Sequence, residues 1–212
     1  MKLFGTVNRK SFNTLKLRFA LAEASVEYEF VPVDLVKGEQ KTPAFLAMNP
    51  HGKVPVLLDG TFALPESDAI LWYLAEKFPA AKLLPAAGGL SGAEARARVM
   101  QWCNFASTAL YPAYADFWTY ALGAAEKRLP WAAELAQQKL TRHLDLLETV
   151  LSGRQFLAGP DTGSLSIADL SNASMVNTLK MKLPSDPFVG RPQLSAWFER
   201  ITSRPSWIKA VE

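Results

Sequence analysis

The chain has 212 residues, of which 49% are hydrophobic and 20% are charged, close to the average for soluble globular proteins. This composition excludes a disordered chain and a coiled coil. The net charge of +3 is spread along the chain without a run of like charges, and no stretch approaches the ~20 apolar residues of a membrane span. We therefore expect neither a nucleic-acid partner nor a membrane contact.

The first 80 residues alternate short β-rich runs with helical patterns. Strands are predicted at residues 3–4 and at residues 27–31, where polar and apolar side chains alternate. Between them, apolar residues at helical spacing predict a helix over residues 12–24, with Lys16 and Arg18 mostly on its other faces. A loop through residues 37–43 follows.

The next segment predicts a hairpin and a helix. Residues 54–58 form an apolar strand, and the Asp-Gly pair at residues 59–60 is a strong turn signal leading into residues 62–64. Ser67 is a natural N-cap for a helix that runs to about residue 78. The pattern indicates an α/β domain over residues 1–80.

After a linker rich in Ala, Gly and Pro at residues 79–92, every long periodic segment is helical. Helices are predicted over residues 93–109, with a continuation interrupted by Pro112, then over 131–151, from about Ser166, and over 193–203. We therefore predict an all-α second domain over residues 87–212.

Val54 and Pro55 stand at the start of an apolar strand, where proline removes a donor from the hydrogen-bond ladder. Two explanations remain open. Pro55 begins a strand at a sheet edge, or a cis Val54–Pro55 bond leaves the main chain of Val54 free to pair with a short peptide.

Two serines precede predicted helices in this half. The first-turn amides near Ser67 favour an anion, and Glu66 beside it favours an ammonium group, so a zwitterionic amino-acid head satisfies both. Ser11 lies at a second helix start, where Arg9 and Lys10 add positive potential that stabilises a thiolate supplied by a ligand. An ordinary helix cap is the alternative in both cases.

The ordered combination of these features resembles the cytosolic glutathione transferase family over essentially the whole chain. The resemblance rests on residues 33–46 (VDLVKGEQKTPAFL), 49–57 (NPHGKVPVL), 59–60 (DG) and 66–70 (ESDAI). In the helical half it rests on residues 166–169 (SIAD) and 204–207 (RPSW). It implies a thioredoxin-like first domain, an all-helical second domain and an active cleft between them. The pattern is similar to the bacterial branch and to phi-like members.

The resemblance also implies roles for individual residues. Glu66 and Ser67 match the residues that hold the γ-glutamyl end of glutathione. The main chain of Val54, with a cis Pro55 behind it, matches the position that pairs with the cysteinyl part. Two lysines, Lys41 and Lys53, match positions that reach the glycine carboxylate.

For activation of the thiol, Ser11 aligns with the hydroxyl of serine-type members, and Asn13 aligns with an asparagine of bacterial disulfide-reducing relatives. Because residues 6–11 contain no Tyr and no Cys, tyrosine-type and cysteine-type chemistry are disfavoured. The loop is about two residues longer than in the phi pattern, which leaves Ser11, Asn13 and Thr14 as candidates. We expect Ser11 and Asn13 to be the catalytic residues.

The expected activity is transfer of glutathione to a small electrophile, with glutathione as co-substrate and no resident cofactor. The alternatives are a glutathione-dependent disulfide reductase or peroxidase, and a non-catalytic glutathione-binding protein. The resemblance implies a homodimer. With one cysteine, two histidines and no apolar secretory signal near Met1, we expect no metal site and a reducing, cytoplasmic location.

Several residues outside these motifs invite a functional role. Cys103 is expected to be a buried, inert thiol, and Asp169 to cap a helix rather than act as a base. The aromatic stretch containing Tyr111, Tyr114, Trp118 and Tyr120 either packs in the core or forms the wall of a second-substrate pocket.

Overall fold

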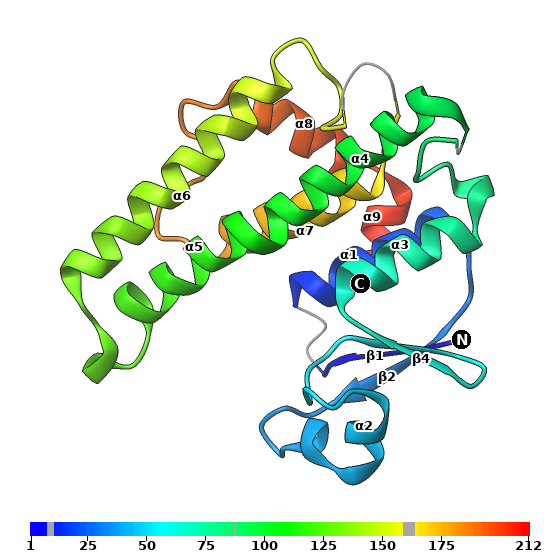
Figure 1. Ribbon diagram of the computed structural model, residues 1–212. Helices are drawn as coiled ribbons and strands as arrows, with labels where there is room; N and C mark the ends of the chain where they lie inside the picture. The colour runs from blue at the N-terminus through cyan, green and yellow to red at the C-terminus, as the bar shows by residue number, and fades with distance from the viewer. Residues whose placement is uncertain (8–10, 87, 159–163) are drawn as a thin grey trace.

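A four-stranded sheet lies at the centre of the N-terminal half (Figure 1). The computed structural model describes residues 1–7, 11–86, 88–158 and 164–212. The strands are β1 (Lys2–Thr6), β2 (Glu29–Val33), β3 (Val56–Asp59) and β4 (Phe62–Pro65), in the order β2-β1-β3-β4. β1 and β2 are parallel, whereas β1–β3 and β3–β4 are antiparallel. Gly60, with a φ of +61°, allows the tight turn between β3 and β4.

Three helices complete this half: α1 (Phe12–Glu23), α2 (Pro43–Met48) and α3 (Ser67–Lys77). α1 and α3 cover one face of the sheet, and α2 lies on the other side (Figure 1). The side chains of β1 and β3 alternate accordingly, because Leu3 and Leu57 join the core under α1 and α3 while Val56 packs with Phe45 of α2. The predicted thioredoxin-like α/β half is confirmed.

The C-terminal half is helical, as predicted. It contains α4 (Gly89–Phe105), α5 (Tyr111–Phe117), α6 (Pro130–Leu151), α7 (Ile167–Lys182), α8 (Pro192–Thr202) and α9 (Pro205–Val211). None of the helices in the described ranges combines the length and the apolar composition that crossing a bilayer requires.

The predicted interruption at Pro112 is wrong. α4 continues through a π-helical turn, Ala106–Leu110, into α5 and a second π-helical turn, Trp118–Leu122. Proline in a regular helix clashes with the carbonyl one turn back, and the wide turn just before Pro112 relieves that clash.

Other boundaries also differ from the prediction. β2 begins two residues later than expected, and neither the short helix α2 nor the terminal helix α9 was predicted. α9 is held by tertiary contacts, because Arg204 binds both carboxylate oxygens of Glu23 at 2.6 and 2.9 Å and Trp207 packs against Phe19. Contacts of this kind between distant segments leave no periodic signal in a helix of seven residues.

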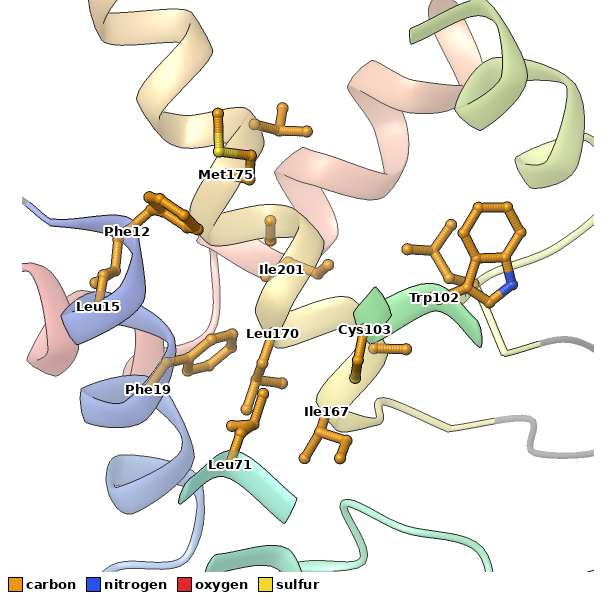
Figure 2. Packing of buried hydrophobic residues seen from close by; sticks show 14 of the residues in the cluster. Phe12, Leu15, Phe19, Leu71, Trp102, Cys103, Ile167, Leu170, Met175 and Ile201 are labelled. Atoms are coloured by element: carbon orange, nitrogen blue, oxygen red, sulfur yellow. The ribbon is translucent and has the colours of Figure 1, made fainter. Parts of the chain in front are cut away.

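A single hydrophobic core joins the two halves. Phe12 and Phe19 of α1 face Leu170 and Met175 of α7 (Figure 2), and α1 also packs against α9. Because α1 is covered by the sheet on one side and by helices on the other, the expectation that its charged residues lie mostly on other faces is wrong. Lys16 and Arg18 are both buried.

Candidate active site

A cavity of about 700 Å³ opens between the two halves. The N-terminal ends of α1 and α3 and the loop before β3 form one side. The π-helical turn after α4, α5 and the C-terminal end of α7 form the other side. Every predicted site residue except Lys41 lines it: Ser11, Asn13, Lys53, Val54, Pro55, Glu66 and Ser67. The fold therefore gathers segments that are far apart in the sequence.

Ser11 is the N-cap residue of α1. Its carbonyl accepts hydrogen bonds from the amides of Thr14 and Leu15, at 3.0 and 2.8 Å, which starts the helix. Its hydroxyl makes no capping hydrogen bond, and the residue lines the cavity. A ligand atom placed there would lie in the positive potential of a helix N-terminus. The predicted contribution of Arg9 and Lys10 falls on residues outside the described ranges.

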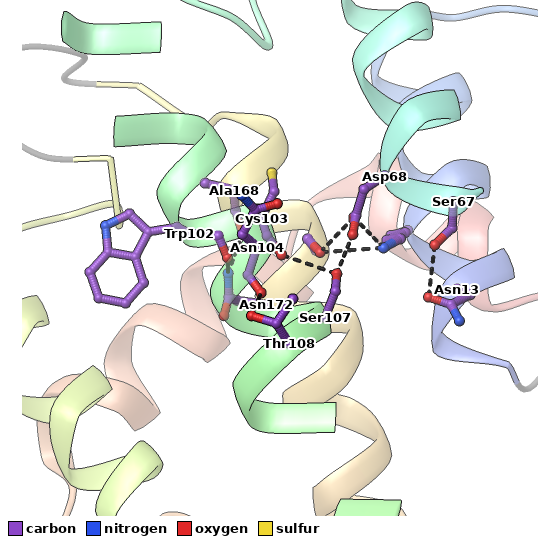
Figure 3. Close-up of polar contacts among 12 residues, drawn as sticks. Asn13, Ser67, Asp68, Trp102, Cys103, Asn104, Ser107, Thr108, Ala168 and Asn172 are labelled. Atoms are coloured by element: carbon purple, nitrogen blue, oxygen red, sulfur yellow. Dashed lines mark hydrogen bonds and ion pairs between the residues drawn. The ribbon is translucent and has the colours of Figure 1, made fainter. Parts of the chain in front are cut away.

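The other two candidates for the thiol contact point in different directions. Asn13 lines the cavity, and its Oδ1 accepts a hydrogen bond of 2.9 Å from the hydroxyl of Ser67 (Figure 3). Thr14 is fully buried and faces the sheet, where a Cβ added at Gly5 would lie only 2.7 Å from its methyl group. The cavity is therefore lined by Ser11 and Asn13 and not by Thr14.

The turn into α3 differs from the prediction in one detail. Glu66, rather than Ser67, occupies the N-cap position, and its carbonyl accepts from the amide of Ile70 at 2.9 Å. Glu66 has a φ of +68°, a left-handed conformation that costs a non-glycine residue roughly 1–3 kcal/mol. Its carboxylate has no ion-pair partner among the described side chains. The strained turn therefore presents a free carboxylate, a hydroxyl and the first-turn amides to the cavity.

The Val54–Pro55 bond is cis, as the resemblance implies. β3 begins only at Val56, so Val54 precedes the ladder and its main-chain groups are not used by the sheet. An extended ligand lying against Val54 has a donor and an acceptor available there.

The two predicted lysines lie on either side of α2, Lys41 just before this helix and Lys53 in the loop after it. Lys53 is exposed and lines the cavity, and its carbonyl is fixed by the side-chain amide of Asn49 at 2.7 Å. Lys41 lies outside the lining, with its ammonium 3.4 Å from the carbonyl of His51. It also passes close to Gly52, a position that requires glycine because its φ is +60° and an added Cβ would lie 2.9 Å from the main-chain oxygen of Gln40.

A buried polar cluster beneath the cavity was not predicted. The ammonium of Lys16, whose side chain is fully buried, lies 2.5 Å from the Asp68 carboxylate. The second oxygen of Asp68 accepts from Ser107, and the hydroxyl of Ser171 lies 3.5 Å from both Lys16 and Asp68 (Figure 3). Contacting residues here are separated by 39 to 155 positions in the chain, and no local pattern in a single sequence pairs them.

The two walls of the cavity correspond to two known domains. Residues 1–76 match the family described as glutathione S-transferase, N-terminal domain, and residues 110–205 match glutathione S-transferase, C-terminal domain. The chain belongs to the glutathione S-transferase family. The resemblance seen in the motifs is therefore confirmed at the level of the family.

Individual members of the family align with this chain over nearly its whole length. Glutathione S-transferase F9 of Arabidopsis thaliana is 34% identical, over 90% of this chain and 88% of its own. Glutathione S-transferase 3 of Zea mays is 32% identical, over 100% and 93%. A solved structure, the glutathione transferase URE2P8 of Phanerochaete chrysosporium with oxidized glutathione, aligns with a TM-score of 0.86 at 30% identity, covering 99% and 92% of the two chains.

Only part of the aromatic stretch, which was expected either to pack in the core or to form a pocket wall, lines the cavity. Tyr111 and Tyr114 line the cavity, whereas Trp118 and Tyr120 are not part of its lining. The ring of Tyr111 lies 5.0 Å from that of Phe12, which is also in the lining. Burial raises the pKa of the Tyr114 phenol, so this tyrosine is a neutral hydrogen-bonding group at physiological pH.

Two predictions about residues outside the cavity are confirmed. Cys103 is buried, and burial raises the pKa of its thiol to about 12, so this family member holds it as an inert thiol. Asp169 forms a capping box with Ser166 at the start of α7. In the parts of the chain that the structure describes, no three His, Cys, Asp or Glu side chains are grouped so as to hold a metal ion.

Proposed function

We propose that the chain is a glutathione transferase of the serine type, in which Ser11 activates the thiol of glutathione for attack on a small electrophile. Glutathione acts as co-substrate, and the chemistry needs no resident cofactor. The observation that carries the proposal is the Ser11 hydroxyl. It is not used by the helix cap, and the residue lines the same cavity as the turn at Glu66 and Ser67.

The proposed binding mode follows the polar groups along the cavity. The γ-glutamyl carboxylate binds Ser67 and the first-turn amides of α3, and the γ-glutamyl ammonium group binds the free carboxylate of Glu66. The cysteinyl part pairs with the main chain of Val54. The glycine carboxylate is directed to the lysines at positions 41 and 53. This mode matches each charge of glutathione with an opposite charge or a dipole.

In this mode the thiol lies near the N-terminus of α1. A free thiol has a pKa of about 8.5, and lowering it by ~2 units requires ~2.7 kcal/mol of preferential stabilisation of the thiolate. A hydrogen bond donated by Ser11, together with the helix dipole, has that magnitude. The thiolate sulfur then forms a bond with the electrophilic carbon, the leaving group departs with its bonding electrons, and the thiol proton passes to solvent.

A disulfide reductase or peroxidase is the second candidate, and the position of Asn13 favours it. The amide of Asn13 lines the cavity and is oriented by the hydroxyl of Ser67. If the thiol binds Asn13 instead of Ser11, attack on a sulfur or a peroxide becomes the expected reaction. A non-catalytic glutathione-binding protein is the third candidate.

Titration of bound glutathione by its ultraviolet thiolate absorbance tests the assignment. Replacing Ser11→Ala should raise the pKa of the bound thiol by ~1–2 units and lower the rate roughly ten- to a hundredfold, the effect of one charge-assisted hydrogen bond. Asn13→Ala is the matched comparison. A shift with Asn13→Ala and none with Ser11→Ala would overturn the serine assignment, and tight binding without turnover of electrophiles, peroxides or disulfides would indicate a binding protein.

We further propose a cytoplasmic homodimer, because members of the family are typically symmetric dimers, and a place in the bacterial, phi-like branch. The branch rests on the motifs at residues 38–41 (GEQK) and 49–55 (NPHGKVP). Light scattering at micromolar concentration should give the mass of two chains, and the mass of one chain would contradict the dimer.

A further inference from the structure

The end of the cavity that the helical half supplies has a distinct chemistry. Beyond Ser107, which binds Asp68, it is formed by two tyrosines of α5 and two residues near the C-terminal end of α7, namely Tyr111, Tyr114, Thr178 and Lys182. The aromatic wall reaches Phe12, which directly follows Ser11 in the chain. A planar group held against this wall would therefore lie beside the proposed position of the thiol.

Lys182 is a charged residue of this wall whose role is not accounted for by the contacts described so far. Its exposed ammonium lies 5.9 Å from the ring centre of Trp118, and it forms no ion pair with a carboxylate in the described ranges. The carboxylates in the lining are already matched. Asp68 pairs with Lys16, and Glu66 is assigned to the ammonium of glutathione.

We propose that this end of the cavity selects electrophiles that combine a planar aromatic or unsaturated system with a carboxylate, and that Lys182 is the residue that binds the carboxylate. The inference rests on the proposed transferase function and names the substrate class of the same cavity. A carboxylate beside Lys182 gains a charge-assisted hydrogen bond, while the flat part of the substrate lies against Tyr111 and Tyr114.

A cation in the last turn of a helix also stabilises the helix dipole, which is the structural alternative for Lys182. Lys180 provides the internal comparison. It lies in the same last turn of α7, but its ammonium lies over the rings of Phe188 and Phe198 and it is not part of the cavity lining. If only the dipole matters, the two lysines should behave alike.

The test uses a matched pair of electrophiles, 4-chloro-3,5-dinitrobenzoate and its neutral methyl ester, at saturating glutathione. In both reactions the glutathione sulfur bonds to the ring carbon that carries chlorine, chloride leaves with the bonding electrons, and the thiol proton goes to the buffer. For each variant, the ratio of kcat/KM for the acid to kcat/KM for the ester is divided by the ratio of the uncatalysed rates.

Lys182→Gln should lower this ratio about tenfold, the effect of one hydrogen bond between charged groups, through the acid alone. Lys182→Arg should restore most of it, and Lys180→Gln should leave it unchanged. Added salt should weaken turnover of the acid and not of the ester. An unchanged ratio in Lys182→Gln, or an equal loss for both electrophiles, would overturn the proposal.

Equilibrium binding separates this proposal from the proposed function. The probes are the two conjugates of these electrophiles with glutathione, one with the free carboxylate and one as the methyl ester, measured by quenching of tryptophan fluorescence. The dissociation constant of the acid conjugate should rise about tenfold in Lys182→Gln while that of the ester conjugate stays constant. Equal constants for the two would refute the role of Lys182. Absence of turnover by the unaltered protein would count against the transferase function instead.

Discussion

Ser11 and Ser166 occupy equivalent places, each at the N-cap position of a long helix, yet the structure uses them differently. Ser166 is buried, and its amide and hydroxyl each donate to the Asp169 carboxylate at 3.0 Å. Ser11 is partly exposed and lines the cavity, and its hydroxyl does not cap α1. Ser166 therefore has a structural role at the start of α7, whereas Ser11 is available to a ligand.

The residue three positions later accounts for the difference. After Ser166 this residue is Asp169, whose carboxylate reaches back and completes a capping box. After Ser11 it is Thr14, which is buried against the sheet and has no such reach. A serine before a helix is therefore a structural cap where an acidic residue three positions later binds it, and a candidate ligand contact where none does.

The largest effect on stability should come from disrupting the capping box at Ser166. Besides Ser166, the Asp169 carboxylate accepts from the amide of Leu157 at 2.9 Å and from the indole of Trp197 at 3.0 Å. Asp169→Ala strands these buried donors, at roughly 1–3 kcal/mol each, so we expect the free energy of unfolding to fall by about 4 kcal/mol. Urea denaturation measures it.

The control is Asp116→Ala, because Asp116 is half-exposed and pairs with Lys139 at 3.8 Å on the surface. This change should cost less than about 1 kcal/mol. Equal losses for the two variants would mean that the capping box at Ser166 is not structurally important, and the comparison with Ser11 would lose its basis.

The ion pair between Lys16 and Asp68 should give the next largest effect. Lys16→Met leaves the Asp68 carboxylate without its cation, and we expect about 2–3 kcal/mol of destabilisation, less than for a fully buried pair because Asp68 is 25% exposed. Adding Asp68→Leu should recover most of that loss, since no unpaired charge remains.

Lys2→Met serves as the control, because Lys2 pairs with Glu29 at an exposed position. It should change the free energy of unfolding by less than about 1 kcal/mol. If the double variant at positions 16 and 68 is instead as unstable as the sum of the single variants, the two side chains do not act as a pair.

Substitutions at the turn into α3 should have smaller effects, and these should appear in the binding of glutathione rather than in stability. Ser67→Ala removes a hydroxyl that contacts Asn13 but does not cap the helix, so KM for glutathione should rise about tenfold with less than ~1 kcal/mol lost in stability. Glu66→Gln should act in the same direction. An unchanged KM with a lower melting temperature would make the turn a structural feature like the one at Ser166.

Replacement of Cys103 should have the smallest effect on the glutathione site. Because burial raises the pKa of its thiol to about 12, its thiolate fraction at pH 8 is about three orders of magnitude below that of a free thiol. Labelling with Ellman's reagent should therefore be about a thousandfold slower in the native protein than in urea. Cys103→Ala should leave the pKa of bound glutathione unchanged, and a shift in that pKa would require Cys103 to communicate with the cavity.

The local patterns of the chain predicted a large part of this architecture. The hairpin at residues 59–60, the helix after Glu66, the long helix α6 and the capping box at Ser166 all follow from interactions within a few residues. Errors occurred where an element depends on distant contacts, as in α9, or on a compensation further along the helix, as at Pro112. A short-range pattern contains neither kind of information.

The sequence by itself determined the α/β half, the helical half and the residue types available for binding glutathione, because these are encoded in spacing and local chemistry, and its motifs carried the resemblance to the family. The tertiary structure alone decided which of those residues share a cavity. It turned Thr14 toward the sheet and Ser11 toward the ligand side, buried Lys16 against Asp68, and placed Lys182 on the wall opposite Ser67. The physical reason is that burial and charge pairing are set by neighbours from the other half of the chain, which close on the site only when the two halves pack together.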